Sequence, residues 1–154
     1  MTDLRDPFER LCRSHRRLEE RLDDLARAVR EKNVVGLRDV CAFLDRQVRR
    51  HEEDEERSLF PRLREKDGTE LVGVLEREHR EHEALAARLE RAVDALDRDE
   101  VDTDLAPAAD AITSAYRKHI ADEETGLFPL ARTKLTPEEL DVMAREMEER
   151  RTRM

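Results

Sequence analysis

Hydrophobic residues recur at intervals of three and four along most of this chain. In the first segment, from about residue 6 to 31, they fall on one helical face. The same spacing returns over about 37–60, 69–93 and 108–128, with polar turns between the segments. We therefore predict four long amphipathic helices, which would pack as an up-down-up-down four-helix bundle.

Local signals mark the ends of these predicted helices. Asp6-Pro7 combines an acid with a proline suited to a first helical turn. The Phe-Pro pairs at 60–61 and 128–129 are expected to end the second and fourth helices, because proline supplies no backbone N–H. Thr136–Glu139 has the spacing of a capping box and would begin a short fifth helix over about 137–151.

The composition supports an all-α fold. Charged residues make up 45% of the chain and aromatic residues 3%, whereas strands favour aromatic and β-branched residues. At 154 residues the chain is long enough to bury one core without disulfides or metals. We expect a single domain over 1–154, with the bundle over about 6–131 and the short helix after it.

Charge and cysteine usage exclude several classes of function. The net charge is −9 and the arginines are interleaved with acids, so no basic surface for nucleic acid is expected. No apolar run approaches the roughly 18 residues of a membrane span, and the N-terminus lacks an apolar signal core. Cys12 and Cys41 form no CxxC pair and lie at different predicted heights. We expect a cytoplasmic protein, monomeric or weakly dimeric, without a disulfide.

A short acidic motif occurs twice in the chain. HEEDEERSLFP (51–61) and HIADEETGLFP (119–129) are identical at seven of eleven positions. Residues 14–29 also align with 78–93, including a histidine, two arginines and a leucine. The first helix thus resembles the third and the second resembles the fourth, which predicts two similar hairpins related by a pseudo-twofold axis.

Four of the five histidines are predicted to lie at one level of the bundle. His15 and His51 are equidistant from Asn33 in the first turn. The midpoint between His51 and His79 lies at the second connection, and the midpoint between His79 and His119 lies at the third. Each of the four also has a glutamate one turn later, on the same helix face. The pairs are His15/Glu19, His51/Glu55, His79/Glu83 and His119/Glu123.

Imidazoles and carboxylates that converge inside a bundle are suited to a pair of non-haem iron or manganese ions. Carboxylates bridge and neutralise the two cations, and neutral imidazoles complete the coordination. So many acids buried without a cation would be strongly destabilising. Either a metal is bound, or these residues form a solvated acidic face with incidental histidines.

These motifs resemble the hemerythrin-like family of His/His/Glu cation-binding bundles. The similarity covers nearly the whole chain and lies in a first-helix histidine, a third-helix histidine and two His-x-x-x-Glu motifs followed by Phe-Pro. It implies two non-haem iron ions bridged by the carboxylates of Glu55 and Glu123. The terminal ligands would be His15, His51, His79 and His119.

The chain also departs from the oxygen-carrying members of that family. They have a second histidine where this chain has Glu83, and an aspartate in the fourth helix where it has Glu123. Either His82 or Glu83 could be the extra ligand, and Glu83 is expected because it shares the face of His79 better. The resemblance then implies a protein that binds or reduces a small oxidant (oxygen, peroxide or nitric oxide). The alternatives are an iron- or oxygen-responsive sensor and an iron-centre repair protein.

Two other classes of protein are compatible with a helical bundle of this kind. Ferritin-like di-iron enzymes use Glu-x-x-His pairs, and only Glu76/His79 has that spacing here. A metal-free helical interaction bundle stays open. Tyr116, one turn before His119, is expected to be an ordinary core residue, and Glu52 a solvated acid.

Overall fold

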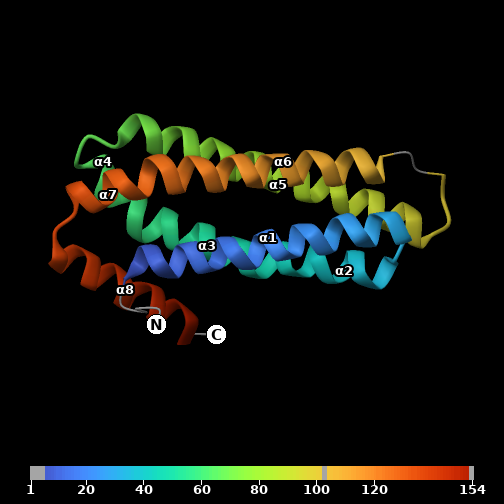
Figure 1. Ribbon diagram of the computed structural model, residues 1–154, viewed down its shortest axis with the longest axis horizontal. Helices are drawn as coiled ribbons and strands as arrows, with labels where there is room; N and C mark the ends of the chain where they lie inside the picture. Colours follow the sequence, from blue (N-terminus) through green and yellow to red (C-terminus); the bar gives the residue numbers. More distant parts are fainter. Residues whose placement is uncertain (1–5, 102–103, 153–154) are drawn as a thin grey trace.

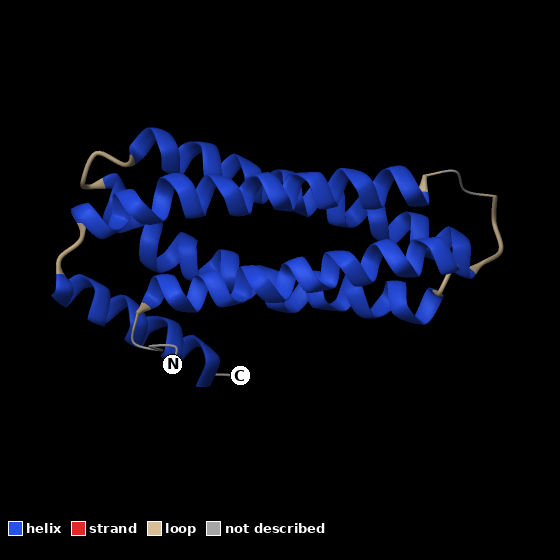
Figure 2. Ribbon diagram, viewed as in Figure 1, coloured by secondary structure: helices blue, strands red, loops and turns tan. Residues whose placement is uncertain are grey.

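The computed structural model of the protein describes residues 6–101 and 104–152, in which all regular structure is helical (Figures 1 and 2). Four long antiparallel helices form a bundle, as predicted. The first is α1 (Pro7–Glu31) and the third is α5 (Thr69–Asp97). The second runs without a break through α2 (Val34–Phe43), η1 (Leu44–Val48), α3 (Arg49–Asp54), η2 (Glu55–Leu59) and α4 (Phe60–Arg64). The fourth runs through α6 (Leu105–Asp122), η3 (Glu123–Leu127) and α7 (Phe128–Lys134), and the fifth is α8 (Pro137–Thr152).

The predicted starts of the first and fifth helices are confirmed by their capping contacts. The Asp6 carboxylate accepts hydrogen bonds from the backbone N–H groups of the first turn of α1. Thr136 and Glu139 exchange the two hydrogen bonds of a capping box, each 3.1 Å long. The predicted polar connection at 97–104 contains residues 102 and 103, which lie outside the described residues, and the rest of it joins α5 to α6.

The prediction that the two Phe-Pro pairs end their helices is wrong. Both helices continue, because a wide π-helical turn precedes each proline: η2 before Pro61 and η3 before Pro129. In η2 the N–H of Phe60 reaches the carbonyl of Glu55, five residues back. The wider turn accommodates a residue that has no N–H and whose ring would clash within an α-helical turn. Both η2 and η3 begin at a glutamate of the predicted metal site, Glu55 and Glu123.

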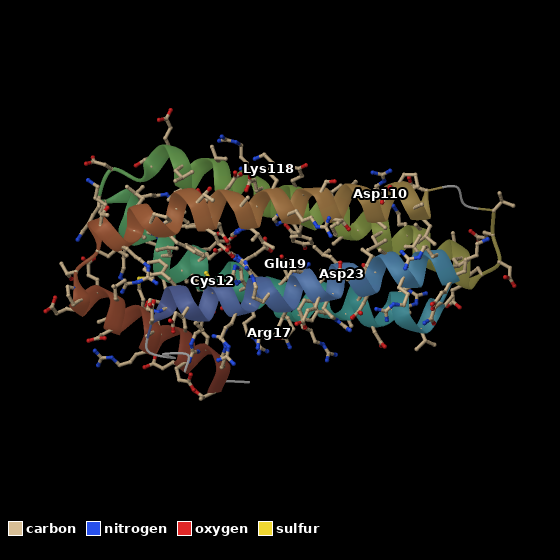
Figure 3. All side chains as sticks on the ribbon, in the orientation of Figure 1. Cys12, Arg17, Glu19, Asp23, Asp110 and Lys118 are labelled. Carbon is tan, nitrogen blue, oxygen red and sulfur yellow. The ribbon has the colours of Figure 1, made fainter. Side chains whose placement is uncertain are left out.

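Two hydrophobic cores fill the bundle, one on each side of a layer of buried polar residues. The first core contains Leu22, Leu37, Leu89 and Ile112, and the second contains Phe8, Phe60, Leu75 and Met143. Figure 3 shows side chains filling the space between the ribbons, whereas charged residues such as Arg17, Asp110 and Lys118 lie on the outside. The buried polar layer contains His15, His51, Asp54, Glu55, Ser58, Glu78, His79, His82, His119 and Glu123.

Helix α8 packs against the side of the bundle near one end, next to α1 and η2. Its Met143 and Met147 are buried in the second core. Its Arg150 and Arg151 donate hydrogen bonds of 2.9 and 3.0 Å to the two oxygens of the fully buried Asp54. The C-terminal helix therefore contacts the residue that immediately precedes Glu55. None of the described helices has the length and apolar character needed to cross a membrane.

Candidate metal centre

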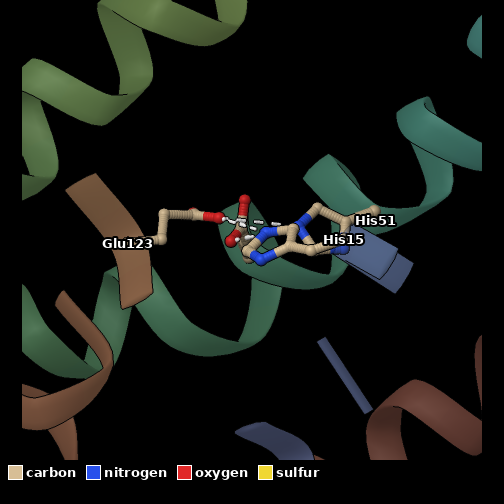
Figure 4. Close-up of side chains that lie close together, drawn as sticks. His15, His51 and Glu123 are labelled. Atoms are coloured by element: carbon tan, nitrogen blue, oxygen red, sulfur yellow. Dashed lines mark hydrogen bonds and ion pairs between the residues drawn. The ribbon is translucent and has the colours of Figure 1, made fainter. Parts of the chain in front are cut away.

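Six of the seven residues predicted to bind metal converge in the middle of the bundle. They come from all four long helices and each is at most 6% exposed. Figure 4 shows His15 and His51 from the first hairpin facing Glu123 from the second. The predicted common level of the four histidines is thereby confirmed. The six residues are His15, His51, Glu55, His79, His119 and Glu123.

The six side chains form two overlapping sets, each of which could hold one cation. His15 and His51 form one set with the two glutamates, and His79 and His119 form the other with the same two glutamates. Within each set, the possible ligand atoms lie within 4.8 Å of one another. Glu55 and Glu123 belong to both sets, so the geometry suits two cations that share two carboxylates.

Individual distances show how closely the sets are packed. Nε2 of His15 lies 2.9 Å from Oε1 of Glu123, and Nε2 of His79 lies 3.1 Å from Oε1 of Glu55. Across each repeat motif, Nε2 of His51 is 3.4 Å from Oε2 of Glu55, and Nε2 of His119 is 3.3 Å from Oε2 of Glu123. The Nε2 atoms of all four rings therefore face the shared carboxylates.

Carboxylates outside the centre hold three of the rings in this orientation. Nδ1 of His15 lies 2.7 Å from Glu124, Nδ1 of His79 lies 2.8 Å from Glu56, and Nδ1 of His119 lies 2.8 Å from Glu78. A proton on Nδ1 leaves Nε2 free to bind a metal, and such outer carboxylates also raise the basicity of the imidazole.

Several buried polar atoms at the centre have no hydrogen-bond partner among the described residues. They include Nε2 of His51 and His119 and Oε2 of Glu55 and Glu123. Buried groups without partners are costly, and a cation bound between them would satisfy all four. Because the set mixes neutral imidazole nitrogens with anionic carboxylate oxygens, these residues fit a first-row transition metal.

The charges of the centre shift the pKa values of its residues in the metal-free protein. Burial alone would lower the pKa of His51, but the charge of Glu55 and the close approach of both glutamate carboxylates to its Nε2 raise it to about 10. Burial likewise opposes protonation of His79, whose hydrogen bond and charge contact with Glu55 raise its pKa to about 9. Burial would raise the pKa of Glu55, but the charge of His51 and contacts with neighbouring side chains together lower it well below its ordinary value. Protons thus take the place of cations when no metal is bound.

These shifts predict how the stability of the metal-free protein depends on pH. The pKa values of His51 and His79 lie above the ordinary value of about 6.5, so their contribution is complete below that pH and lost as the pH rises through about 9 to 10. We expect the free energy of unfolding of the metal-free form, measured in urea, to fall across this window. The metal-loaded form should not show this loss, since its imidazoles are already neutral ligands. Equal pH profiles for the two forms would contradict the prediction.

Glu83, the seventh predicted ligand, does not join the centre. Its side chain is 67% exposed and lies 3.9 Å from Arg49. The buried stripe of α5 runs through Glu78 and His82, four residues apart, so Glu83 falls just beyond its edge. We correct the expectation accordingly: between the two alternatives considered for this helix, His82 is the residue that faces inward.

Two residues near the centre differ in how well the sequence predicted them. Tyr116 is a buried core residue, as expected, and its ring centroid lies 4.3 Å from that of His82. The expectation of a solvated Glu52 is wrong, because its side chain is only 15% exposed and its Oε2 lies 2.9 Å from Nδ1 of His82.

The outer carboxylates were missed altogether. Glu56 and Glu124 occupy the same position in the two copies of the acidic motif, directly after the shared glutamates, and the identity of the copies there was the available signal. Glu78 has no such signal, since the position aligned with it is Ser14.

Comparison with known protein families matches residues 6–131 to the hemerythrin HHE cation-binding domain. The match ends before α8. Searches of curated proteins and of solved structures find no match.

Proposed function

Because this chain belongs to the hemerythrin HHE cation-binding family, we propose that its six converging side chains hold two non-haem iron ions. His15 and His51 would bind one ion, and His79 and His119 the other. Glu55 and Glu123 would bridge the two. The observation that supports this proposal most directly is that both ligand sets share the same two buried carboxylates, each with an oxygen that has no hydrogen-bond partner among the described residues.

The function that this centre supports best is binding or reduction of a small oxidant: oxygen, peroxide or nitric oxide. An iron pair supplies a site for such a ligand and electrons for its reduction. Four protein ligands for each ion would leave coordination positions for an external molecule. The protein would orient the imidazoles through Glu56, Glu78 and Glu124, and the two hydrophobic cores would exclude bulk water.

A second candidate function is an iron-responsive sensor, and the contact of α8 with Asp54 favours it. Arg150 and Arg151 of α8 bind the neighbour of the shared ligand Glu55, so metal occupancy could affect how α8 docks. If this function holds, protease should cleave α8 faster in the metal-free protein than in the loaded protein. Equal cleavage rates would favour the oxidant-binding function.

The metal proposal is tested by elemental analysis of protein purified without added metal. About two irons per chain are expected. His119→Ala should lose most of the iron, because that imidazole belongs to the centre and is only 3% exposed. The matched control is Arg117→Ala, which removes a side chain 62% exposed on the same helix and should leave the iron content unchanged. Full iron retention by His119→Ala would overturn the assignment.

A further inference from the structure

The pseudo-twofold relation between the hairpins breaks down at two residues that contact each other beside the metal centre. Glu52 stands where the second motif has Ile120, and His82 stands where the first helix has Leu18. Leu18 and Ile120 are both part of the hydrophobic core. Glu52 and His82 instead form a hydrogen-bonded pair, 2.9 Å apart. One half of the centre is therefore flanked by apolar side chains and the other by a polar pair.

The polar pair lies next to the ligand set of His79 and His119. Oε2 of Glu52 is 3.6 Å from Nε2 of His79, the nitrogen that faces the shared carboxylates. The ring of His82 packs edge-on against that of His119, with the centroids 4.8 Å apart. His82 is 2% exposed. Because burying a polar pair is more costly than burying a leucine and an isoleucine, this departure from the repeat points to a role in function.

A surface cavity leads to the same pair. It has a volume of about 90 Å³, and the exposed side chains of Arg49 and Glu83 are part of its wall. Glu52, His82 and Tyr116 also line it. A smaller void of about 10 Å³ is lined by Glu52 and Tyr116 together with His15, His51 and His119. Glu52 and Tyr116 thus stand between the outer cavity and the void at the ligands.

The chemistry of the cavity wall restricts what can use this route. The larger cavity can hold several water-sized molecules, whereas the inner void is about the size of one. The wall of the larger cavity contains four acids and one arginine, so anions are disfavoured there. The acids are Asp45, Glu52, Glu83 and Glu90, and the arginine is Arg49. Carboxylate, imidazole and phenol groups offer hydrogen bonds to a small neutral molecule that can both donate and accept them.

We propose that this cavity admits the external ligand to the metal centre, where the inner void touches His15, His51 and His119. Glu52, His82 and Tyr116 select hydrogen peroxide over apolar diatomic molecules. The inference rests on the proposed di-iron function and adds the point of entry and the ligand class. A site built to hydrogen-bond its ligand discriminates strongly against molecules that cannot form those bonds. Nitric oxide is the matched apolar probe.

The test replaces the polar pair Glu52 and His82 with the residue types found at the matching positions of the repeat, Ile120 and Leu18. The double variant Glu52→Ile, His82→Leu is loaded with iron and titrated optically with hydrogen peroxide and, separately, with nitric oxide. We expect unchanged iron content, peroxide binding weakened by about tenfold or more, and nitric oxide binding changed by less than about threefold. Glu53→Ile is the control, because it places the same residue on a half-exposed neighbour outside both cavities and should alter neither titration.

Two milder variants test the proposal even if the double variant does not fold. Glu52→Gln keeps the size of the side chain, and Tyr116→Phe removes only the hydroxyl. Each should weaken peroxide binding severalfold and leave nitric oxide binding unchanged. Equal effects on both probes, or none on peroxide, would overturn the inference. Loss of iron from Glu52→Gln would also overturn it, since Glu52 would then be a metal ligand.

The same measurements on the unaltered protein separate this inference from the proposed function. An unaltered chain that holds no iron, or that binds neither probe, would refute the proposed function itself. An unaltered chain that holds iron and binds peroxide, combined with variants that behave like it, would refute only the role of Glu52, His82 and Tyr116.

Discussion

Replacing Glu123 with alanine is expected to empty both metal positions, whereas replacing His51 should empty mainly one. Glu123 belongs to both ligand sets, with Oε1 2.9 Å from Nε2 of His15 and Oε2 3.3 Å from Nε2 of His119. His51 belongs only to the set that contains His15. Elemental analysis should therefore find almost no iron in Glu123→Ala and about one iron per chain in His51→Ala.

The neighbouring residue Glu124 provides the control for this comparison. Its carboxylate lies 2.7 Å from Nδ1 of His15 and so acts on the centre only through that ring. Glu124→Ala should keep the iron at high metal concentration but bind it about 10 to 100 times more weakly, as measured by competition with a chelator. If Glu123→Ala retained a full ion, the carboxylate would not be shared, and the centre would be two separate sites.

The helices and the level of the histidines could be predicted because both follow from local rules. Helical periodicity and the cap at Asp6 set the first helix, and a fixed rise per residue then places His15 and His51 at the same distance from Asn33. The repeat motif supplied the rest, since each copy carries one histidine and one shared glutamate. Neither inference needs knowledge of how the helices tilt.

The errors concern features that depend on tertiary structure. The π turn before Pro61 keeps a helix continuous where local preference would end it, because packing of Phe60 and Leu63 in the second core stabilises the extra length. His82 and Glu83 lie three and four residues after His79 on α5, so either could share its face. Only the packing of that helix decides which of them is buried. Glu52 is largely buried because it forms a hydrogen bond with His82, which is thirty residues away in sequence.

The contact between α8 and the ligand-bearing helix also has no local signal. Asp54 and its partners Arg150 and Arg151 are 96 and 97 residues apart, and no motif in the sequence links them. Asp54 is nevertheless fully buried, and Arg150 also donates a hydrogen bond to Ser58 in η2. Helix α8 therefore provides the countercharge for the buried acid next to Glu55.

Asp54→Ala is accordingly expected to destabilise the metal-free protein by about 3 kcal/mol. Removing one partner of a buried ion pair leaves the other charge without compensation, and Arg150 is only 13% exposed. The matched control is Asp122→Ala, at the same position of the second motif, where the aspartate pairs with an exposed Lys118. That change should cost less than about 1 kcal/mol.

Urea denaturation of both metal-free variants measures the difference, and iron retention after chelator treatment tests its link to the centre. Asp54 precedes Glu55 directly, so Asp54→Ala should also release iron faster than Asp122→Ala, even though Asp122 precedes the other shared ligand, Glu123. Equal losses of stability in the two variants would show that the arginines of α8 contribute no more than a surface ion pair. A large loss of stability with unchanged iron release would show that α8 stabilises the fold without affecting the metal centre. That result would count against the sensor as a function of this protein.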